Sequence, residues 1–276
     1  MYGVNPYREF ESHPLRQFFS QLSQCGPAAN ARLFIGVFIA RRGMLASVMI
    51  HSVRRINALA QRLGATRYLE IGLRRGGTFR EVEIADRTGV DPAYQFDAEA
   101  MSNEATRIYR LTSDAFFAAE PHTTRYDIVY VDGLHTFEQV MRDVNNAILR
   151  MHTRSVMLID DTVPNDVYST LPDLETAERF RTAAGSTRRS WHGDVFKTIF
   201  YIHDFWPGLN YRTIVGSGNP QTLVWRGIGP LRKPIFNNVE RISRLSFFEF
   251  HDYFKYMLPA GEDETINLCI SEIETV

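Results

Sequence analysis

The chain has 276 residues, of which 44% are hydrophobic, and its 31 Lys and Arg residues nearly balance its 32 Asp and Glu residues. This length allows a large buried core, and the composition excludes a disordered, a collagen-like and a disulfide-based protein. Binding to a phosphate backbone needs a concentrated excess of cationic side chains, so we expect no nucleic-acid partner.

The cysteine content and the N-terminal sequence predict the cellular compartment. Only Cys25 and Cys269 are present, far apart in the sequence, which suits a reducing cytosol. The N-terminus lacks the basic-then-apolar layout of a signal peptide. The apolar stretch 33–40 is shorter than the roughly 20 apolar residues that cross a membrane. We therefore expect a cytoplasmic protein without a membrane partner.

The pattern of apolar residues predicts three regions. Residues 1–60 form a helical arm or cap, because apolar residues recur at helical spacing from Ala31 to Leu63, with a break at Gly43. Residues 61–228 form a catalytic domain in which short apolar strands alternate with helical patterns. Residues 229–276 form a helical extension.

The central alternation predicts an α/β fold of the Rossmann-like type. Strands are expected at 67–71, 108–112, 126–131 and 155–159, with another short strand that ends near 89–91. Helices are expected from 78, at 114–119 and at 135–151. Strands that are apolar on both faces and separated by helices indicate a mainly parallel sheet with helices on both faces. Strands at 211–215 and 221–225 predict a C-terminal antiparallel hairpin, and the Phe-rich segment 238–257 predicts a helix.

A glycine-rich turn follows the first strand, with the pattern Glu70-x-Gly72-x-x-x-Gly76-x-Thr78. In parallel sheets ligands bind at the carboxyl ends of the strands, and glycines let backbone N–H groups approach a ligand. Asp91 ends the next strand, where a carboxylate can accept hydrogen bonds from both hydroxyls of a ribose. Glu70 would repel a pyrophosphate, which favours a sulfonium amino-acid nucleoside over NAD. The alternative is a plain strand-to-helix turn.

This turn resembles the first motif of class I S-adenosylmethionine (SAM)-dependent methyltransferases. The resemblance implies a Rossmann-like methyltransferase fold, with SAM as cofactor and Asp91 at its ribose. It also implies that Glu70, Gly72 and Gly76 border the methionine part of SAM, with Thr78 completing the motif. This family commonly places an acid near the adenine after the third strand, so Asp114 of the Ser-Asp pair is a further cofactor-binding candidate. A helix N-cap is the equal alternative for that pair.

Three carboxylates follow two buried strands: Asp132 follows 126–131, and Asp160 and Asp161 follow 155–159. If these strands are adjacent, the acids converge beside the glycine-rich turn, where they repel one another unless protonated, paired or neutralised by a metal. Such an oxygen-rich set suits Mg²⁺ or Mn²⁺, and no Cys/His spacing supports zinc. Loop or capping roles remain the alternative for a single acid.

His135 lies three residues beyond Asp132, at the start of the next helix. A neutral imidazole there could take the proton of a substrate hydroxyl whose pKa the metal lowers. We therefore predict His135 and Asp132 as catalytic residues and Asp132, Asp160 and Asp161 as metal ligands. A helix-capping arrangement is the alternative for the segment that joins Asp132 to His135.

The segment VDGLHTFEQV, followed by Arg142-Asp143, is similar to one in the methyltransferase family that includes macrolide and aminocoumarin sugar O-methyltransferases. The metal-ligand positions of that family match Asp132, Asp160 and Asp161. Catechol-type O-methyltransferases have a comparable layout with a catalytic lysine where His135 stands, which leaves the identity of the base open.

The segment Trp191-His-Gly-Asp-Val-Phe-Lys197 also resembles segments in relatives of this family. Asp194 and Lys197 are three residues apart and are expected to pair with each other. His192 is a further candidate for contact with the substrate.

These patterns favour a SAM-dependent methyltransferase that O-methylates a small hydroxylated molecule, a sugar or a natural product, with the help of a divalent metal. A metal-independent O- or N-methyltransferase, a non-catalytic SAM- or nucleotide-binding protein and an NAD-dependent oxidoreductase are the alternatives. The aromatic segment 247–254 packs on the main domain by default, but a homo-oligomer interface is left open.

Overall fold

The computed structural model describes residues 50–227 and 231–275. The arm predicted for residues 1–30, the apolar stretch 33–40 and the helix break at Gly43 lie outside these residues. Residues from Ile50 onward form one compact unit, and the predicted domain boundaries at residues 60 and 228 stay predictions. Within the described part, no helix is both long and apolar enough to cross a lipid bilayer.

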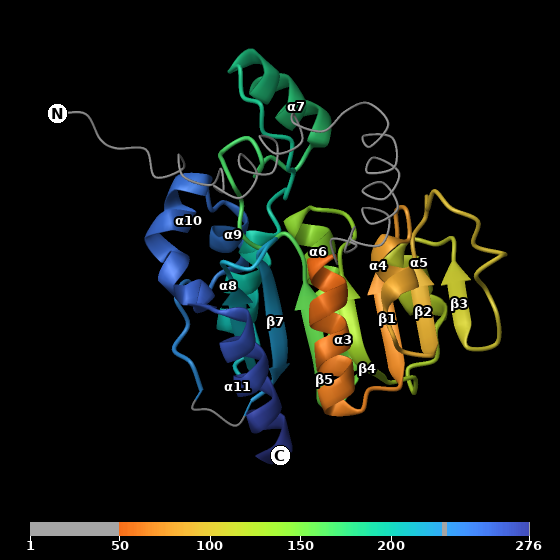
Figure 1. Ribbon diagram of the computed structural model, residues 1–276. Helices are drawn as coiled ribbons and strands as arrows, with labels where there is room; N and C mark the ends of the chain where they lie inside the picture. Colours follow the sequence, from red (N-terminus) through yellow and green to blue (C-terminus); the bar gives the residue numbers. More distant parts are fainter. Residues whose placement is uncertain (1–49, 228–230, 276) are drawn as a thin grey trace, which may run out of the picture. The chain divides into compact units, whose positions relative to one another are not determined.

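One sheet of eight strands forms the centre of the unit, in the order β3-β2-β1-β4-β5-β7-β6-β8 (Figure 1). The strands are β1 Arg67–Ile71, β2 Asp86–Val90, β3 Thr106–Tyr109, β4 Tyr126–Val131, β5 Met151–Ile159, β6 Leu209–Ile214, β7 Gln221–Arg226 and β8 Pro259–Ala260. Strands β1 to β5 are parallel, whereas β7 runs antiparallel to both β5 and β6. The predicted Rossmann-like fold with a mainly parallel sheet and a C-terminal antiparallel hairpin is confirmed.

Helices cover both faces of this sheet. One face packs against α3 His51–Leu63, α4 Gly77–Glu81 and α11 Glu262–Thr275. The other packs against α5 Ser113–Ala119, α6 Phe137–Leu149, α8 Phe196–Phe205, α9 Val239–Ser243 and α10 Phe247–Tyr253. The remaining helices are α7 Leu174–Ala183 and the 3₁₀ turn η1 Phe254–Met257.

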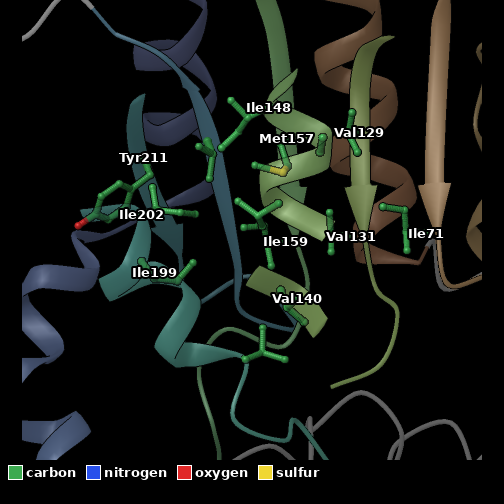
Figure 2. Close-up of a cluster of buried hydrophobic side chains, with 14 of the residues drawn as sticks. Ile71, Val129, Val131, Val140, Ile148, Met157, Ile159, Ile199, Ile202 and Tyr211 are labelled. Carbon is green, nitrogen blue, oxygen red and sulfur yellow. The ribbon is translucent and has the colours of Figure 1, made fainter. Parts of the chain in front are cut away.

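Each central strand contributes side chains to two apolar layers, because successive side chains of a strand point to opposite faces. In β4, Ile128 and Tyr130 face α3, whereas Val129 and Val131 face α6. Figure 2 shows the α6 layer, where Val140 and the side chains of α8 lie against β4 and β5. Burial on both faces fixes the register of β4 and β5, and with it the place where each strand ends.

Several predicted elements have different bounds in the structure. The helix predicted at 135–151 is α6, which ends at Leu149, while the strand predicted at 155–159 is β5, which begins at Met151. Arg150 is the C-cap of α6, and its buried guanidinium donates to Glu120 and to the carbonyl oxygen of Phe117. The strand predicted at 108–112 is β3, which is displaced toward the N-terminus and ends at Tyr109.

The prediction of a single helix at 238–257 was wrong, because this segment contains α9, α10 and η1. Ser246 begins α10 with a capping box, in which its hydroxyl accepts from the backbone N–H of Glu249 and the Glu249 carboxylate accepts from the backbone N–H of Ser246. Such a box starts a new helix. The segment is rich in Phe throughout, so its hydrophobic pattern does not reveal where α9 ends and α10 begins.

Candidate active site at the carboxyl edge of the sheet

The turn after β1 packs against the end of β4 through a glycine. Gly72 has a φ of 91°, and its N–H donates to the carbonyl oxygen of Val90 at 2.9 Å. A Cβ at Gly72 would lie 1.9 Å from the backbone oxygen of Asp132, so no other residue fits here. Gly76 also has a left-handed backbone, with a φ of 69°. The predicted cofactor turn and the predicted acid cluster are therefore in direct backbone contact.

Asp91, directly after β2, holds this turn in place. One carboxylate oxygen, Oδ2, accepts from the backbone N–H groups of Leu73 at 2.9 Å and Arg74 at 2.8 Å. The other, Oδ1, accepts from the N–H of Ala93 at 2.6 Å. A carboxylate oxygen offers about two acceptor positions. Asp91 thus lies directly after β2, as expected for the residue predicted to bind the ribose. One acceptor position is left on its Oδ1.

Glu70 lies inside the protein, next to Tyr68. Its side chain is buried and accepts a hydrogen bond from the Tyr68 hydroxyl at 2.6 Å. Burial raises the pKa of the Glu70 carboxyl well above its usual range, against the lowering effect of that hydrogen bond. Burial therefore disfavours the anionic form of Glu70 that the sequence suggested.

The two remaining cofactor candidates lie on the helices that flank this edge. Thr78 is in the first turn of α4, with its hydroxyl 3.5 Å from that of Ser52. Asp114 is in the first turn of α5 and pairs with Arg142 at 3.2 Å. The N-cap of α5 is Thr112, so the alternative that the Ser-Asp pair forms this cap was wrong.

The structure brings Asp132, His135 and Asp161 together, because β4 and β5 are adjacent. One ligand atom from each of the three lies within 4.8 Å of the others. Nε2 of His135 is 3.4 Å from Oδ1 of Asp132, and Nδ1 is 3.4 Å from Oδ2 of Asp161. The left-handed backbone of Asp161, with a φ of 54°, sets the direction of its side chain.

The electrostatics of this group favour a cation. Burial, and then the charge of Asp160, raise the pKa of Asp132 to about 6 and that of Asp161 to about 7. Burial alone would lower the pKa of His135, but its hydrogen bond to Asp132 and the charge of Asp161 raise it to about 9. A single imidazolium does not compensate these acids. An oxygen-rich, half-buried set of this kind fits Mg²⁺ or Mn²⁺.

Asp160 differs from its neighbour because hydrogen-bond donors surround it. Oδ1 accepts from the side chains of Asn219 at 2.6 Å and Gln221 at 3.0 Å, and from the N–H of Asp161 at 2.9 Å. Oδ2 accepts from the Tyr130 hydroxyl at 2.6 Å. Only Oδ2 keeps an acceptor position, so the predicted metal ligation by Asp160 depends on that oxygen.

The segment at Trp191 fixes the orientation of His135. The carbonyl oxygen of Trp191 lies 3.1 Å from Nδ1 of His135, and the two rings stack with centroids 4.9 Å apart. A Cβ at Gly193 would lie 1.6 Å from the carbonyl oxygen of His135, so these two backbones are in contact. This segment therefore orients His135 so that Nε2 faces Asp132, while Nδ1 lies near both the carbonyl oxygen of Trp191 and Asp161.

Asp194 links the same segment to α6. Its Oδ1 accepts from the N–H of Phe137, the first residue of α6, at 2.7 Å, and its Oδ2 accepts from Lys197 at 2.8 Å. The predicted pairing of Asp194 with Lys197 is confirmed. The sequence did not show the contact with Phe137, because the two residues are far apart in the chain.

His192, a further candidate for contact with the substrate, is buried next to Asp161. Its Nε2 is 3.6 Å from Oδ1 of Asp161. Burial, and then the charge of His135, lower the pKa of His192 to about 4, which keeps this imidazole neutral.

Sequence reasoning missed the residues of the hairpin turn, 216–220, which reaches the acids through Asn219. The pattern Gly-Ser-Gly-Asn-Pro indicated only a turn. The two glycines, with φ values of 81° and 107°, confirm that turn but give no sign of the role of Asn219.

Part of the chain matches a known protein family. A family model described as a methyltransferase domain matches residues 51–162, which include the glycine-rich turn, Asp91 and all three acids after β4 and β5. A search of curated proteins found no match. The segment at Trp191 and the hairpin lie beyond the matched residues.

Solved structures of methyltransferases resemble the chain at low identity. One is an O-methyltransferase from Bacillus cereus in complex with SAH, with 16% identity, covering 77% of this chain and 96% of that one, at a TM-score of 0.40. Another is an SAH-bound methyltransferase from Podospora anserina, with 11% identity, 82% and 99% coverage and a TM-score of 0.47.

Proposed function

We propose that the methyltransferase domain of this chain transfers the methyl group of SAM to a hydroxyl group of a small molecule, a sugar or another natural product, with the help of a divalent cation. The observation that carries this proposal is the group of Asp132, His135 and Asp161, which lies in backbone contact with the glycine-rich turn.

The turn fits a nucleoside cofactor of this kind. It lies at the carboxyl edge of the parallel strands, where such sheets bind ligands. Asp91 keeps one acceptor position for a ribose hydroxyl. Gly72 holds the turn beside Asp132, so a methyl group carried there would be close to the acids. SAM, when bound, supplies a methyl group on a sulfonium whose leaving group is a neutral thioether.

The acids fit a divalent cation. Asp132 and Asp161 would hold it, with the free position on Oδ2 of Asp160 as a further ligand. Water molecules commonly complete such a set. The cation, when bound, lowers the pKa of the acceptor hydroxyl.

His135 is suited to take the proton of that hydroxyl. The carbonyl oxygen of Trp191 can only accept, so neutral His135 keeps its proton on Nδ1 and offers the lone pair of Nε2. The pKa of about 9 depends on Asp132 and Asp161, and neutralising these carboxylates lowers it. As Nε2 takes the proton, the hydroxyl oxygen attacks the methyl carbon, and the electron pair of the breaking C–S bond passes to sulfur.

A metal-independent methyltransferase is the second candidate. The observation that favours it is His135 itself, whose imidazolium pairs with both Asp132 and Asp161. Activity that survives EDTA would favour this candidate, and activity that EDTA abolishes and Mg²⁺ restores would favour the first.

Calorimetry tests the cofactor first. SAM, SAH and NAD⁺ are titrated separately into the full chain, with and without Mg²⁺. We expect micromolar binding of SAM and SAH and no heat from NAD⁺. The absence of SAM binding in both conditions would contradict the proposal. Transfer of labelled methyl groups from SAM to a panel of sugars and phenols then identifies the acceptor class.

A further inference from the structure

We propose that Asn219 is the positioning residue that aims the carboxylate of Asp161 at the cation. We also propose that Arg55 holds the backbone of Asn219 in place. This inference rests on the cation site of the proposed function. Asn219 lies outside the segment that matches the methyltransferase family model, because it belongs to the hairpin turn between β6 and β7, whereas Arg55 lies inside that segment.

Asp161 depends on Asn219 more than its neighbour does. Nδ2 of Asn219 donates to Oδ1 of Asp161 at 2.9 Å and to Oδ1 of Asp160 at 2.6 Å. Asp160 keeps Gln221 and Tyr130 as further side-chain donors. Across residues 50–227 and 231–275, no other hydrogen bond reaches the Asp161 carboxylate, whose two imidazole neighbours stand at 3.4 and 3.6 Å. Loss of the Asn219 amide therefore frees Asp161 and leaves Asp160 held.

The turn that carries Asn219 needs external support, because its two glycines have left-handed backbones and residues 216–220 lie outside the strand ladder. Arg55 of α3 gives that support. Its fully buried guanidinium uses all five of its N–H groups. These donate to the carbonyl oxygen of Asn219 at 2.7 Å, Oε1 of Gln221 at 2.6 Å, the carbonyl oxygen and the hydroxyl of Ser217, both at 3.1 Å, and Glu262 at 2.9 Å.

Arg55 acts here by geometry rather than by charge. Its charge is compensated by Glu262, whose carboxylate also accepts from Arg54 and from the Ser217 hydroxyl. The planar fork of an arginine can hold one turn at several points, and a lysine cannot reproduce it. Arg55 therefore fixes the backbone of Asn219, and Asn219 fixes Asp161.

The experiment measures Mn²⁺ binding by calorimetry, with SAM binding and thermal stability measured on the same samples of the full chain. Groups that orient a metal ligand commonly change affinity by about 10- to 100-fold when they are removed. We expect Asn219→Ala to weaken Mn²⁺ binding by about that factor and to leave SAM affinity within about threefold.

Asn210→Ala is the matched control, because Asn210 lies at the other end of the same hairpin and donates its amide to Glu272 at 2.8 Å. We expect this variant to bind Mn²⁺ like the wild type. Arg55→Lys keeps the charge and is expected to weaken Mn²⁺ binding in the same direction as Asn219→Ala.

Four results would overturn the inference. Wild-type Mn²⁺ affinity in Asn219→Ala removes the positioning role, and an equal loss in Asn210→Ala shows general loosening of the hairpin. Wild-type affinity in a folded Arg55→Lys variant removes Arg55 from the proposal. A wild-type chain that binds SAM but no Mn²⁺ contradicts the cation site, and this inference with it, while methyl transfer from SAM stands.

Discussion

Strand β4 has an aspartate near each end, and each aspartate faces a histidine. Near the start of the strand, Asp127 lies 2.7 Å from Nε2 of His152. Directly after its end, Asp132 lies 3.4 Å from Nε2 of His135. Although the residue types are the same, burial and the charge of Asp160 raise the pKa of Asp132 to about 6, whereas that of Asp127 is lowered.

The neighbours of each pair explain the difference. Asp127 accepts from the backbone N–H groups of Thr66 at 2.7 Å and Arg67 at 2.8 Å, and these bonds together with His152 outweigh its burial. Asp132 instead stands among other acids. An Asp–His pair surrounded by donors is stabilised by them, whereas a pair surrounded by acids would be stabilised by a cation.

The largest effect that separates the two pairs is expected on catalysis. His135→Ala should lower the rate of methyl transfer by about 10²- to 10⁴-fold near neutral pH, the range for a general base. The loss should shrink at higher pH, where the acceptor hydroxyl ionises without help. His152→Ala should keep the wild-type rate. Rates from labelled SAM across a pH series check this, and equal activity of His135→Ala at every pH would exclude the base role.

The next largest effect is expected on the cation. Asp132→Asn should weaken Mn²⁺ binding by about 100-fold, because it removes the negative charge of a ligand rather than a supporting group. Asp127→Asn is the control of the same chemistry on the same strand and should bind Mn²⁺ normally. Calorimetry measures both. A similar loss in the two variants would mean that the distinction between the two ends of β4 is wrong.

Asp91 sharpens the comparison, because backbone N–H groups surround it as they surround Asp127. Unlike Asp127, it was predicted to bind the ribose of SAM. Asp91→Ala should weaken SAM binding by about 1–3 kcal/mol, the cost of lost hydrogen bonds to the ligand and within the turn. Unchanged SAM affinity in calorimetry would place Asp91 with Asp127, as a purely structural acid.

The smallest effect is expected on stability. Asp127→Ala should lower the free energy of unfolding by about 1–2 kcal/mol at pH 7, because two backbone N–H groups and His152 lose their acceptor. The pKa of Asp127 is lowered in the folded state, so its contribution is present above the usual value of 3.8 and is lost as the pH falls below it. Urea unfolding at neutral and acidic pH checks this. A difference from wild type that stays constant with pH would contradict it.

The sequence was sufficient for the central strands and for the acids that follow them. The run Tyr126–Val131 is continuously apolar apart from Asp127, and the structure gives β4 these bounds. Because adjacent parallel strands end at one edge, Asp132 and Asp161 were expected to meet, and the structure brings them together. Strand ends follow from burial, which the order of apolar residues records directly.

The residues that hold the site were not predictable in this way. Arg55 lies in α3, for which the sequence predicts an amphipathic helix. The full burial of Arg55 depends on partners such as Gln221 and Glu262, which are far along the chain. Asn219 looks like an ordinary turn residue. Glu70 was expected as an anion, but burial raises the pKa of its carboxyl and disfavours that form. Local patterns do not contain such long-range contacts.

The contacts of Arg55 also set the order in which the site is completed during synthesis. The ribosome delivers the glycine-rich turn and the acids first, then the hairpin, and Glu262 after the hairpin. A nascent chain that stops before the hairpin has β5 without its partner β7, and Asp161 without the amide that holds it. The glycine-rich turn is thus made early, while the contacts that hold Asp161 are complete only after the hairpin and the start of α11 have been made.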